Sequence, residues 1–250
     1  QDDALLETLQ ARFEFLTKTA NTPSRFTEQL TGANAKRLIL DRDNYYAMTG
    51  GHGGCRGCGE VTALRLIMAA NNALQGRARK EHIAEVEALI AKIEAKLSTL
   101  TDEGRIARLT SSLETINHHL FLLESGPTGE GPAAAVIANS TGCSSVYSST
   151  FPYNPYRDPW VNSLFQDAPA LAKGIYEGIA ADVLVNFRAM RIAELELDDS
   201  YDPAVHDKAF RTFGWENFTE TELGRLPTVF SIGGDGATYD IGFGALSRLL

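Results

Sequence analysis

The stretch AAAVIANSTGC, residues 133–143, decides the fold class of this chain. An uninterrupted apolar run gives way to Asn, Ser, Thr and Gly, which is typical of a buried strand that ends in a loop. A second stretch, LPTVFSIGGDG at residues 226–236, repeats this pattern. Helical patterns lie between the two stretches. We therefore predict an α/β fold with a mostly parallel sheet flanked by helices, and we expect both loops at the carboxyl edge of the sheet.

Residues 79–124 carry a pattern of another kind, in which apolar residues recur at alternating intervals of three and four. The pattern occurs twice, on either side of the turn sequence TDEG at residues 101–104, and most other positions are polar or charged. This spacing predicts two antiparallel helices, an inserted coiled-coil hairpin. We expect a solvated arm that projects from the body of the domain. The apolar positions are Ile83, Val86, Ile90, Ile93, Leu97, Leu100, Ile106, Leu109, Leu113, Ile116, Leu120 and Leu123.

The remaining chain shows weaker patterns. Helices are predicted over residues 2–19, 60–75 and 167–197, and a further helix is expected after residue 241. Residues 147–165 are rich in proline and aromatic residues, and we expect them to form a long loop. We also expect the acidic stretch 198–225 to be irregular.

Composition excludes several classes of protein. The chain has 250 residues, a formal net charge of −9 and no basic cluster, which argues against a nucleic-acid-binding surface. No apolar run approaches the length of about 20 residues that a membrane-spanning helix needs. Three cysteines without a signal peptide do not suggest a secreted disulfide framework, so a cytoplasmic protein is expected. Neither end carries a boundary signal, and we expect the chain to be a segment of a longer polypeptide.

The stretch GGHGGCRGCGE at residues 50–60 places Cys55 and Cys58 among six glycines. The pair is compatible with half of a zinc site, with a redox disulfide or with an iron–sulfur cluster. A redox pair would normally lie near a strand–helix turn with a proline, which is missing here. A cluster needs thiolates with little bulk around its sulfides. Cys143, in another glycine-containing loop, is the natural third ligand.

The second loop contains Asp235 between Gly234 and Gly236, directly after an apolar strand. Glycines allow the backbone N–H groups to approach a ligand, and a carboxylate is a hard oxygen ligand suited to Mg²⁺. Mg²⁺ with a diphosphate near a helix N-terminus is therefore a candidate function for this loop. The alternative is an ordinary turn, since Gly-Asp-Gly by itself is common.

Four blocks, CRGCGE, IANSTGCSSVYSSTFPYNPY, WVNSLFQD and IGGDGATYDIGFGAL, occur in this order. Together they resemble the thiamine-diphosphate-binding domain of the pyruvate:ferredoxin (flavodoxin) oxidoreductase family, over roughly residues 50–76 and 131–250. The resemblance implies the thiamine-diphosphate-binding fold for residues 46–250, with the hairpin at 79–124 as an insertion and 1–45 as an N-terminal helical or linker segment.

The resemblance also implies site residues. Cys55, Cys58 and Cys143 would hold a [4Fe–4S] cluster whose fourth cysteine lies beyond Leu250, and Glu60 and Cys143 would line the cofactor site. Residues 234–237, including Ala237, would hold the diphosphate, with Asp235 on Mg²⁺. No catalytic side chain is assigned within the chain.

The activity that the resemblance implies is oxidative decarboxylation of pyruvate with coenzyme A, giving acetyl-CoA and CO₂. Electrons would pass from thiamine diphosphate to the cluster and on to ferredoxin or flavodoxin. The expected partners are these carriers and further domains or subunits of the same enzyme, as a homo-oligomer. Three alternatives stay open: another 2-oxo acid such as 2-oxoglutarate, a non-redox thiamine-diphosphate enzyme, and a zinc-bound scaffold that docks partners through its arm.

Overall fold

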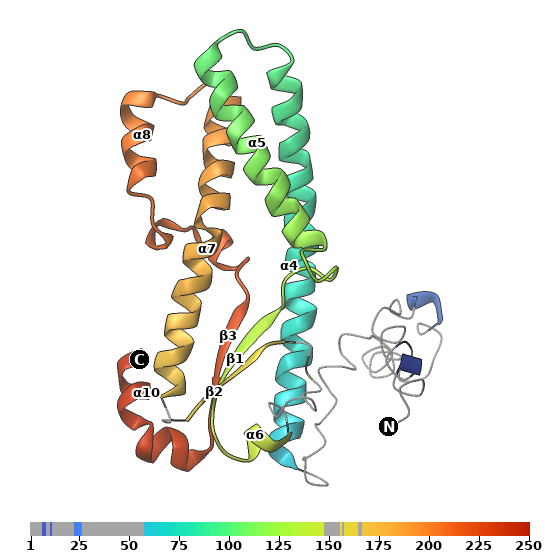
Figure 1. Cartoon of the computed structure of the whole chain (residues 1–250), viewed down its shortest axis with the longest axis vertical. Coiled ribbons are helices and arrows are strands. Elements are labelled where there is room, and N and C mark those ends of the chain that lie inside the picture. Colours follow the sequence, from blue (N-terminus) through green and yellow to red (C-terminus); the bar gives the residue numbers. More distant parts are fainter. Residues whose placement is uncertain are drawn as a thin grey trace.

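The computed structural model of the chain describes residues 7, 8, 11, 23–26, 58–147, 156, 158–164 and 167–250. Within them, long helices accompany a three-stranded sheet in the order β2–β1–β3, and both strand pairs are parallel (Figure 1). The predicted parallel arrangement of the two strand–loop stretches is confirmed. The strands are β1 (Ala135–Ser140), β2 (Trp160–Ser163) and β3 (Thr228–Ile232).

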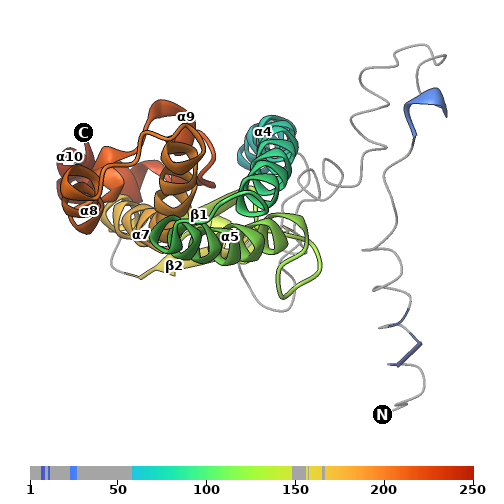
Figure 2. The ribbon, with the colours of Figure 1, turned by 90° about the horizontal axis from the view of Figure 1, so that it is seen from above.

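The two faces of the sheet are covered by different helices, α4 (Gly59–Leu97) and α7 (Ala168–Leu197). Side chains alternate between the faces along a strand. Ile137 accordingly packs in a cluster with α4, whereas its neighbour Ala138 packs in a cluster with α7. Seen from above, α4 and α7 lie on opposite sides of β1 (Figure 2). The sheet is thus the middle layer of a helix–sheet–helix arrangement.

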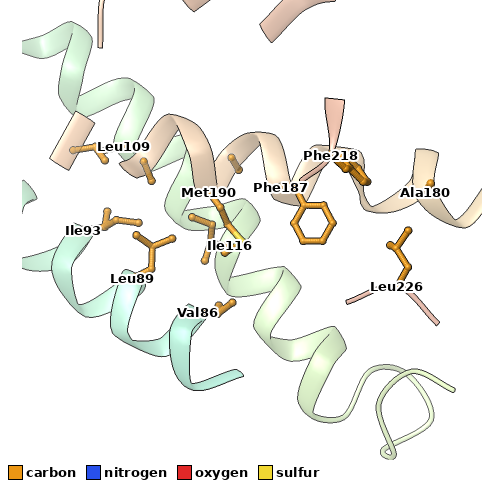
Figure 3. Packing of buried hydrophobic residues seen from close by; sticks show 12 residues of the cluster. Val86, Leu89, Ile93, Leu109, Ile116, Ala180, Phe187, Met190, Phe218 and Leu226 are labelled. Atoms are coloured by element: carbon orange, nitrogen blue, oxygen red, sulfur yellow. The ribbon is translucent and has the colours of Figure 1, made fainter. Parts of the chain in front are cut away.

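The main hydrophobic core lies away from the sheet, between α4, α5 (Glu103–Glu124) and α7 (Figure 3). α4 and α5 are joined by a short turn, as the repeated spacing predicts. Their apolar seam is not solvated, however: Val86, Ile93 and Ile116 are fully buried beside α7 residues such as Phe187 and Met190. The expectation of a projecting arm is therefore wrong, because a third helix covers the seam.

A cluster of charged side chains links α5 to α7 at the end of this core that is distant from the sheet. The carboxylate of Glu196, on α7, is buried and accepts hydrogen bonds from Arg105 and Arg108 on α5. Arg105 also contacts Asp199, just beyond the end of α7. These pairs lie at the turn between α4 and α5, so the hairpin is anchored to α7 at its tip as well as along its seam.

Two sequence-based boundaries need correction, and a third is largely untested. The helix predicted at 60–75 and the first hairpin helix form one continuous helix of 39 residues, which runs through Gly76. The expected loop at 147–165 contains β2, while residues 148–155, 157, 165 and 166 lie outside the described part. The expected helix at 2–19 falls largely outside it too.

The stretch 198–225 is not irregular, because capping residues start two short helices there. Asp202 accepts a hydrogen bond from the backbone N–H of Ala204 and Pro203 occupies the first turn, and Thr219 and Glu222 form a capping box. The other elements are η1 (Ser24–Phe26), α6 (Cys143–Tyr147), α8 (Pro203–Arg211), η2 (Trp215–Asn217), α9 (Glu220–Leu223), η3 (Gly236–Ile241) and α10 (Phe243–Leu249). Among the described helices, none is both long enough and apolar enough to span a bilayer.

Candidate functional site

Cys58 lies at the beginning of α4, at the lower end of that helix in Figure 1. It is the N-cap residue, and its carbonyl oxygen accepts hydrogen bonds from the backbone N–H and the hydroxyl of Thr62 at 3.1 and 3.0 Å. Its side chain is half-buried and packs against the apolar cluster between α4 and the sheet. Cys55 lies outside the described residues, so its predicted place beside Cys58 is not tested.

Cys143 is the first residue of α6, a helix of five residues that follows β1. Its side chain is exposed, and both Cys143 and Cys58 are free thiols. The other end of α6 is attached to α4: Tyr147 is buried, and its hydroxyl donates a hydrogen bond of 3.0 Å to the carboxylate of Glu60. The segment that carries Cys143 is thereby attached to the first turn of α4, the helix whose N-cap is Cys58.

Burial of the Tyr147 ring raises the pKa of its hydroxyl, and the hydrogen bond to Glu60 raises it further. The phenol therefore keeps its proton and remains a donor to Glu60 at neutral pH. This interaction places Glu60, a sequence-predicted site residue, beside the cysteine-bearing helix. Tyr147 itself was not among the predicted site residues.

The Asp235 loop follows β3, and β3 is parallel to β1, so both loops leave the same edge of the sheet. The carboxylate of Asp235 is exposed and makes no capping hydrogen bond at the start of η3. Gly233 brings this loop against the end of β1: a Cβ atom added there would lie 2.7 Å from the Thr238 hydroxyl oxygen and 3.1 Å from Cβ of Ser140. The structure thus places the Asp235 loop next to the strand that leads to Cys143.

Unlike Gly233, three other glycines near this edge have no described atom close to the position of a side chain. A Cβ atom added at Gly59, Gly142 or Gly234 would meet no atom of the described chain within 4 Å. Among the described residues, the backbone positions next to Cys58, Cys143 and Asp235 thus leave room for a bound group. Two thiols and a free carboxylate at such an edge are chemically suited to an iron–sulfur cluster and to Mg²⁺ respectively.

The predicted ligand set is only partly assembled. Within the part of the chain that the structure describes, no three His, Cys, Asp or Glu side chains are grouped closely enough to hold a metal ion. Cys58, Glu60 and Cys143 lie on two elements joined by a hydrogen bond, and residues 234–237 span the loop after β3 and the start of η3. The expected convergence of three thiols includes Cys55 and stays a prediction.

Sequence reasoning missed a buried polar group at the same edge. Asn139 is fully buried at the end of β1, and it forms hydrogen bonds with Ser144, Ser145 and Asn162. A polar residue directly after a continuous apolar run was the available signal, since such a residue needs partners when buried.

The chain is similar to proteins of one enzyme family. It is 34% identical over 119 residues to the pyruvate synthase subunit PorB of Methanosarcina barkeri, which covers 48% of this chain and 27% of that subunit. The PorB subunit of Pyrococcus furiosus is 31% identical over 119 residues, covering 48% of this chain and 24% of the subunit. The pyruvate-flavodoxin oxidoreductase of Enterobacter agglomerans is 26% identical over 272 aligned positions, which cover 88% of this chain and 22% of that enzyme.

The chain is similar to pyruvate synthase PorB subunits and to pyruvate-flavodoxin oxidoreductases. The resemblance to this enzyme family is thereby confirmed. The chain spans about a quarter of the length of these curated relatives. No protein-family model matches the chain, and no solved structure matches it.

Proposed function

We propose that this chain forms the thiamine-diphosphate-binding part of a 2-oxoacid oxidoreductase that decarboxylates pyruvate oxidatively, with coenzyme A as acyl acceptor and ferredoxin or flavodoxin as electron acceptor. The relatives named pyruvate synthase and pyruvate-flavodoxin oxidoreductase support the reaction class. The observation that carries the proposal is the shared edge of β1 and β3, where the Cys143 segment is hydrogen-bonded to the start of α4 and the Asp235 loop lies against the end of β1.

In this proposal, residues 46–250 form the cofactor-binding domain, residues 79–124 are an inserted helical hairpin, and residues 1–45 precede the domain. The hairpin is an insertion in sequence, although its seam belongs to the hydrophobic core. In the same proposal, the helices α4 and α5 pair as an antiparallel coiled coil.

The residues at the edge suit two bound groups. Asp235 would supply a carboxylate ligand to Mg²⁺, and the backbone N–H groups of residues 234–237 would bind a diphosphate. Cys55, Cys58 and Cys143 would hold a [4Fe–4S] cluster. Thiamine diphosphate supplies the electron sink that decarboxylation of a 2-oxo acid requires. The hydrogen bond from Tyr147 would hold the Glu60 carboxylate in place at the cofactor site.

The test is metal and cofactor analysis of the anaerobically prepared full chain. We expect iron, sulfide and a broad visible absorption, together with saturable binding of thiamine diphosphate in the presence of Mg²⁺. Zinc without iron would favour the scaffold alternative. Thiamine diphosphate binding without iron would favour a non-redox enzyme.

Two variants should separate the two groups. Cys143→Ser should lose iron but still bind thiamine diphosphate, because it removes only a thiolate. Asp235→Ala should weaken thiamine diphosphate binding at least tenfold, or about 1.4 kcal/mol, and should leave the iron content unchanged. If both variants lose both groups in folded protein, the assignment of separate ligands is wrong.

A further inference from the structure

Asn139 is a buried amide at the point where β1 ends and the Cys143 segment begins. It is fully buried and lies on the α4 face of the sheet, because it is two positions from Ile137 on the same strand. A buried amide is costly unless its donor and acceptor atoms are paired. The contacts of Asn139 therefore influence the position of the residues that follow β1.

Two of its three partners belong to α6. The hydroxyl of Ser144 donates to Oδ1 of Asn139 at 2.6 Å, and Nδ2 of Asn139 donates to the hydroxyl oxygen of Ser145 at 3.3 Å. The hydroxyl oxygen of Ser145 also accepts from the backbone N–H of Gly142 at 3.3 Å. These two serines directly follow Cys143, so the amide holds the turn of chain that carries the thiol.

The third partner lies on the neighbouring strand. Nδ2 of Asn139 donates to Oδ1 of Asn162, on β2, at 2.8 Å. Asn139 thus links α6 to two strands of the sheet. A helix of five residues is not stable by its own backbone hydrogen bonds, so its position depends on such contacts. Near its other end, the bond between Tyr147 and Glu60 attaches α6 to α4.

We propose that Asn139 is a positioning residue that sets where Cys143 lies relative to Cys58. The inference rests on the proposed function only where it treats Cys143 as a cluster ligand. Side chains behind metal ligands orient those ligands and tune the metal centre. Asn139 would act in this way through Ser144 and Ser145, without touching the cluster itself.

The chain offers a matched control, Asn71, at the opposite end of the sheet. Asn71 is also a buried amide: its Nδ2 donates to the carbonyl of Ala134 at 3.1 Å, and its Oδ1 accepts from the hydroxyl of Thr228 at 2.6 Å. Asn71→Ala should therefore reduce stability about as much as Asn139→Ala, but it leaves the α6 contacts intact.

The first measurement is cross-linking of cluster-free full chain with dibromobimane, a short thiol–thiol reagent, with the Cys58–Cys143 product quantified by peptide mapping. We expect Asn139→Ala to lower the yield of this product at least fivefold relative to the unchanged protein and to Asn71→Ala. Ser144→Ala removes the 2.6 Å bond to Asn139 but leaves the bonds of Asn139 to Ser145 and Asn162, and should lower the yield less. Equal yields in Asn139→Ala and Asn71→Ala, or no such product in the unchanged protein, would overturn the proposal.

The second measurement is the midpoint potential and the electron paramagnetic resonance spectrum of the reduced, anaerobically prepared protein. Both should change in Asn139→Ala and stay unchanged in Asn71→Ala, since a loss of stability alone does not move them. An iron-free unchanged protein whose cross-linking still depends on Asn139 would refute the proposed function and leave the positioning role standing. Unchanged spectra together with unchanged cross-linking in Asn139→Ala would refute the positioning role.

Discussion

Gly233 is the residue at which the Asp235 loop meets the end of β1, the strand that leads to Cys143. It follows β3, and its Cα faces both the hydroxyl of Thr238 within its own loop and Ser140 at the end of β1. Any side chain at this position would enter space that these atoms already occupy. Gly234, the next residue, has open space around the corresponding position. Of these two adjacent glycines, only Gly233 has described neighbours that exclude a side chain.

This difference predicts opposite outcomes for two alanine substitutions. Gly233→Ala should lower the free energy of unfolding by about 1–3 kcal/mol, because the added methyl group forces the loop away from Ser140. Gly234→Ala should leave stability within about 0.5 kcal/mol of the unchanged protein. Chemical denaturation of the two variants measures both effects. The steric account fails if Gly233→Ala is as stable as Gly234→Ala.

The same pair also tests the cofactor site. If the backbone of residue 234 approaches a diphosphate, Gly234→Ala should weaken thiamine diphosphate binding although it does not reduce stability. Titration calorimetry in the presence of Mg²⁺ measures this directly. Unchanged binding would show that the open space beside Gly234 is not where the diphosphate lies.

At the scale of elements, α5 is a structural helix rather than a projecting arm. Its buried residues Leu109 and Ile116 pack in the same cluster as Phe187 and Met190 of α7. Removal of residues 80–124 would therefore uncover an apolar face of α7. We expect such a deletion to give insoluble or aggregated protein.

A single substitution on α5 tests this packing more sharply than the deletion. Ile116 is fully buried, and Ile116→Ala should lower the free energy of unfolding by about 2–5 kcal/mol, as expected for a large-to-small change in a core. Glu114→Ala, at an exposed position of the same helix, should change it by no more than about 0.5 kcal/mol. Equal stability of the two variants, measured by thermal or urea unfolding, would mean that α7 does not cover the seam in solution.

For the whole molecule, two buried histidines connect folding to pH. His82 on α4 and His119 on α5 are almost fully buried, with their Nε2 atoms 3.0 Å apart and the ring of Phe187 beside both. Burial, and next the positive charge of Arg225, lowers the pKa of His82 to about 4. Burial, and next the proximity of His82, lowers the pKa of His119 to about 4.

These shifts predict a loss of stability on acidification. The unfolded chain takes up protons on both histidines near pH 6.5, whereas the folded chain resists protonation until about pH 4. Between these values the unfolded state binds more protons, so the free energy of unfolding decreases as pH falls. At pH 5 the decrease relative to pH 7.5 should be on the order of 2 kcal/mol per histidine.

Neighbouring histidines provide the control for this prediction. His119→Gln should flatten the pH dependence of urea unfolding between pH 7.5 and 5, because it removes one buried titrating group. His118→Gln, at the exposed neighbouring position, should leave the dependence almost unchanged. The same slope in both variants would show that the buried pair does not control acid stability.

Much of the architecture could be predicted from local sequence. The runs at 133–138 and 226–232 predict strands because short, continuous apolar segments bounded by polar, glycine-containing loops are typical of buried strands. Two parallel strands must release their following loops at one edge, so the neighbourhood of the Cys143 and Asp235 loops followed from the pattern alone. The short helices in 198–225 could also have been found from Asp202–Pro203 and from the Thr219–Glu222 capping box.

The sequence by itself determined the helical pair, the parallel strands and the family relationship, since each depends on residues that are close together in the chain or on whole blocks in order. Only the tertiary structure decided that α7 buries the seam of α4 and α5, that Tyr147 joins Glu60, and that Asn139 holds Ser144 and Asn162. Periodicity shows that a helix face is apolar, but it does not show which element covers that face. Contacts between residues up to about a hundred positions apart follow from the packing of whole elements, which no local pattern encodes.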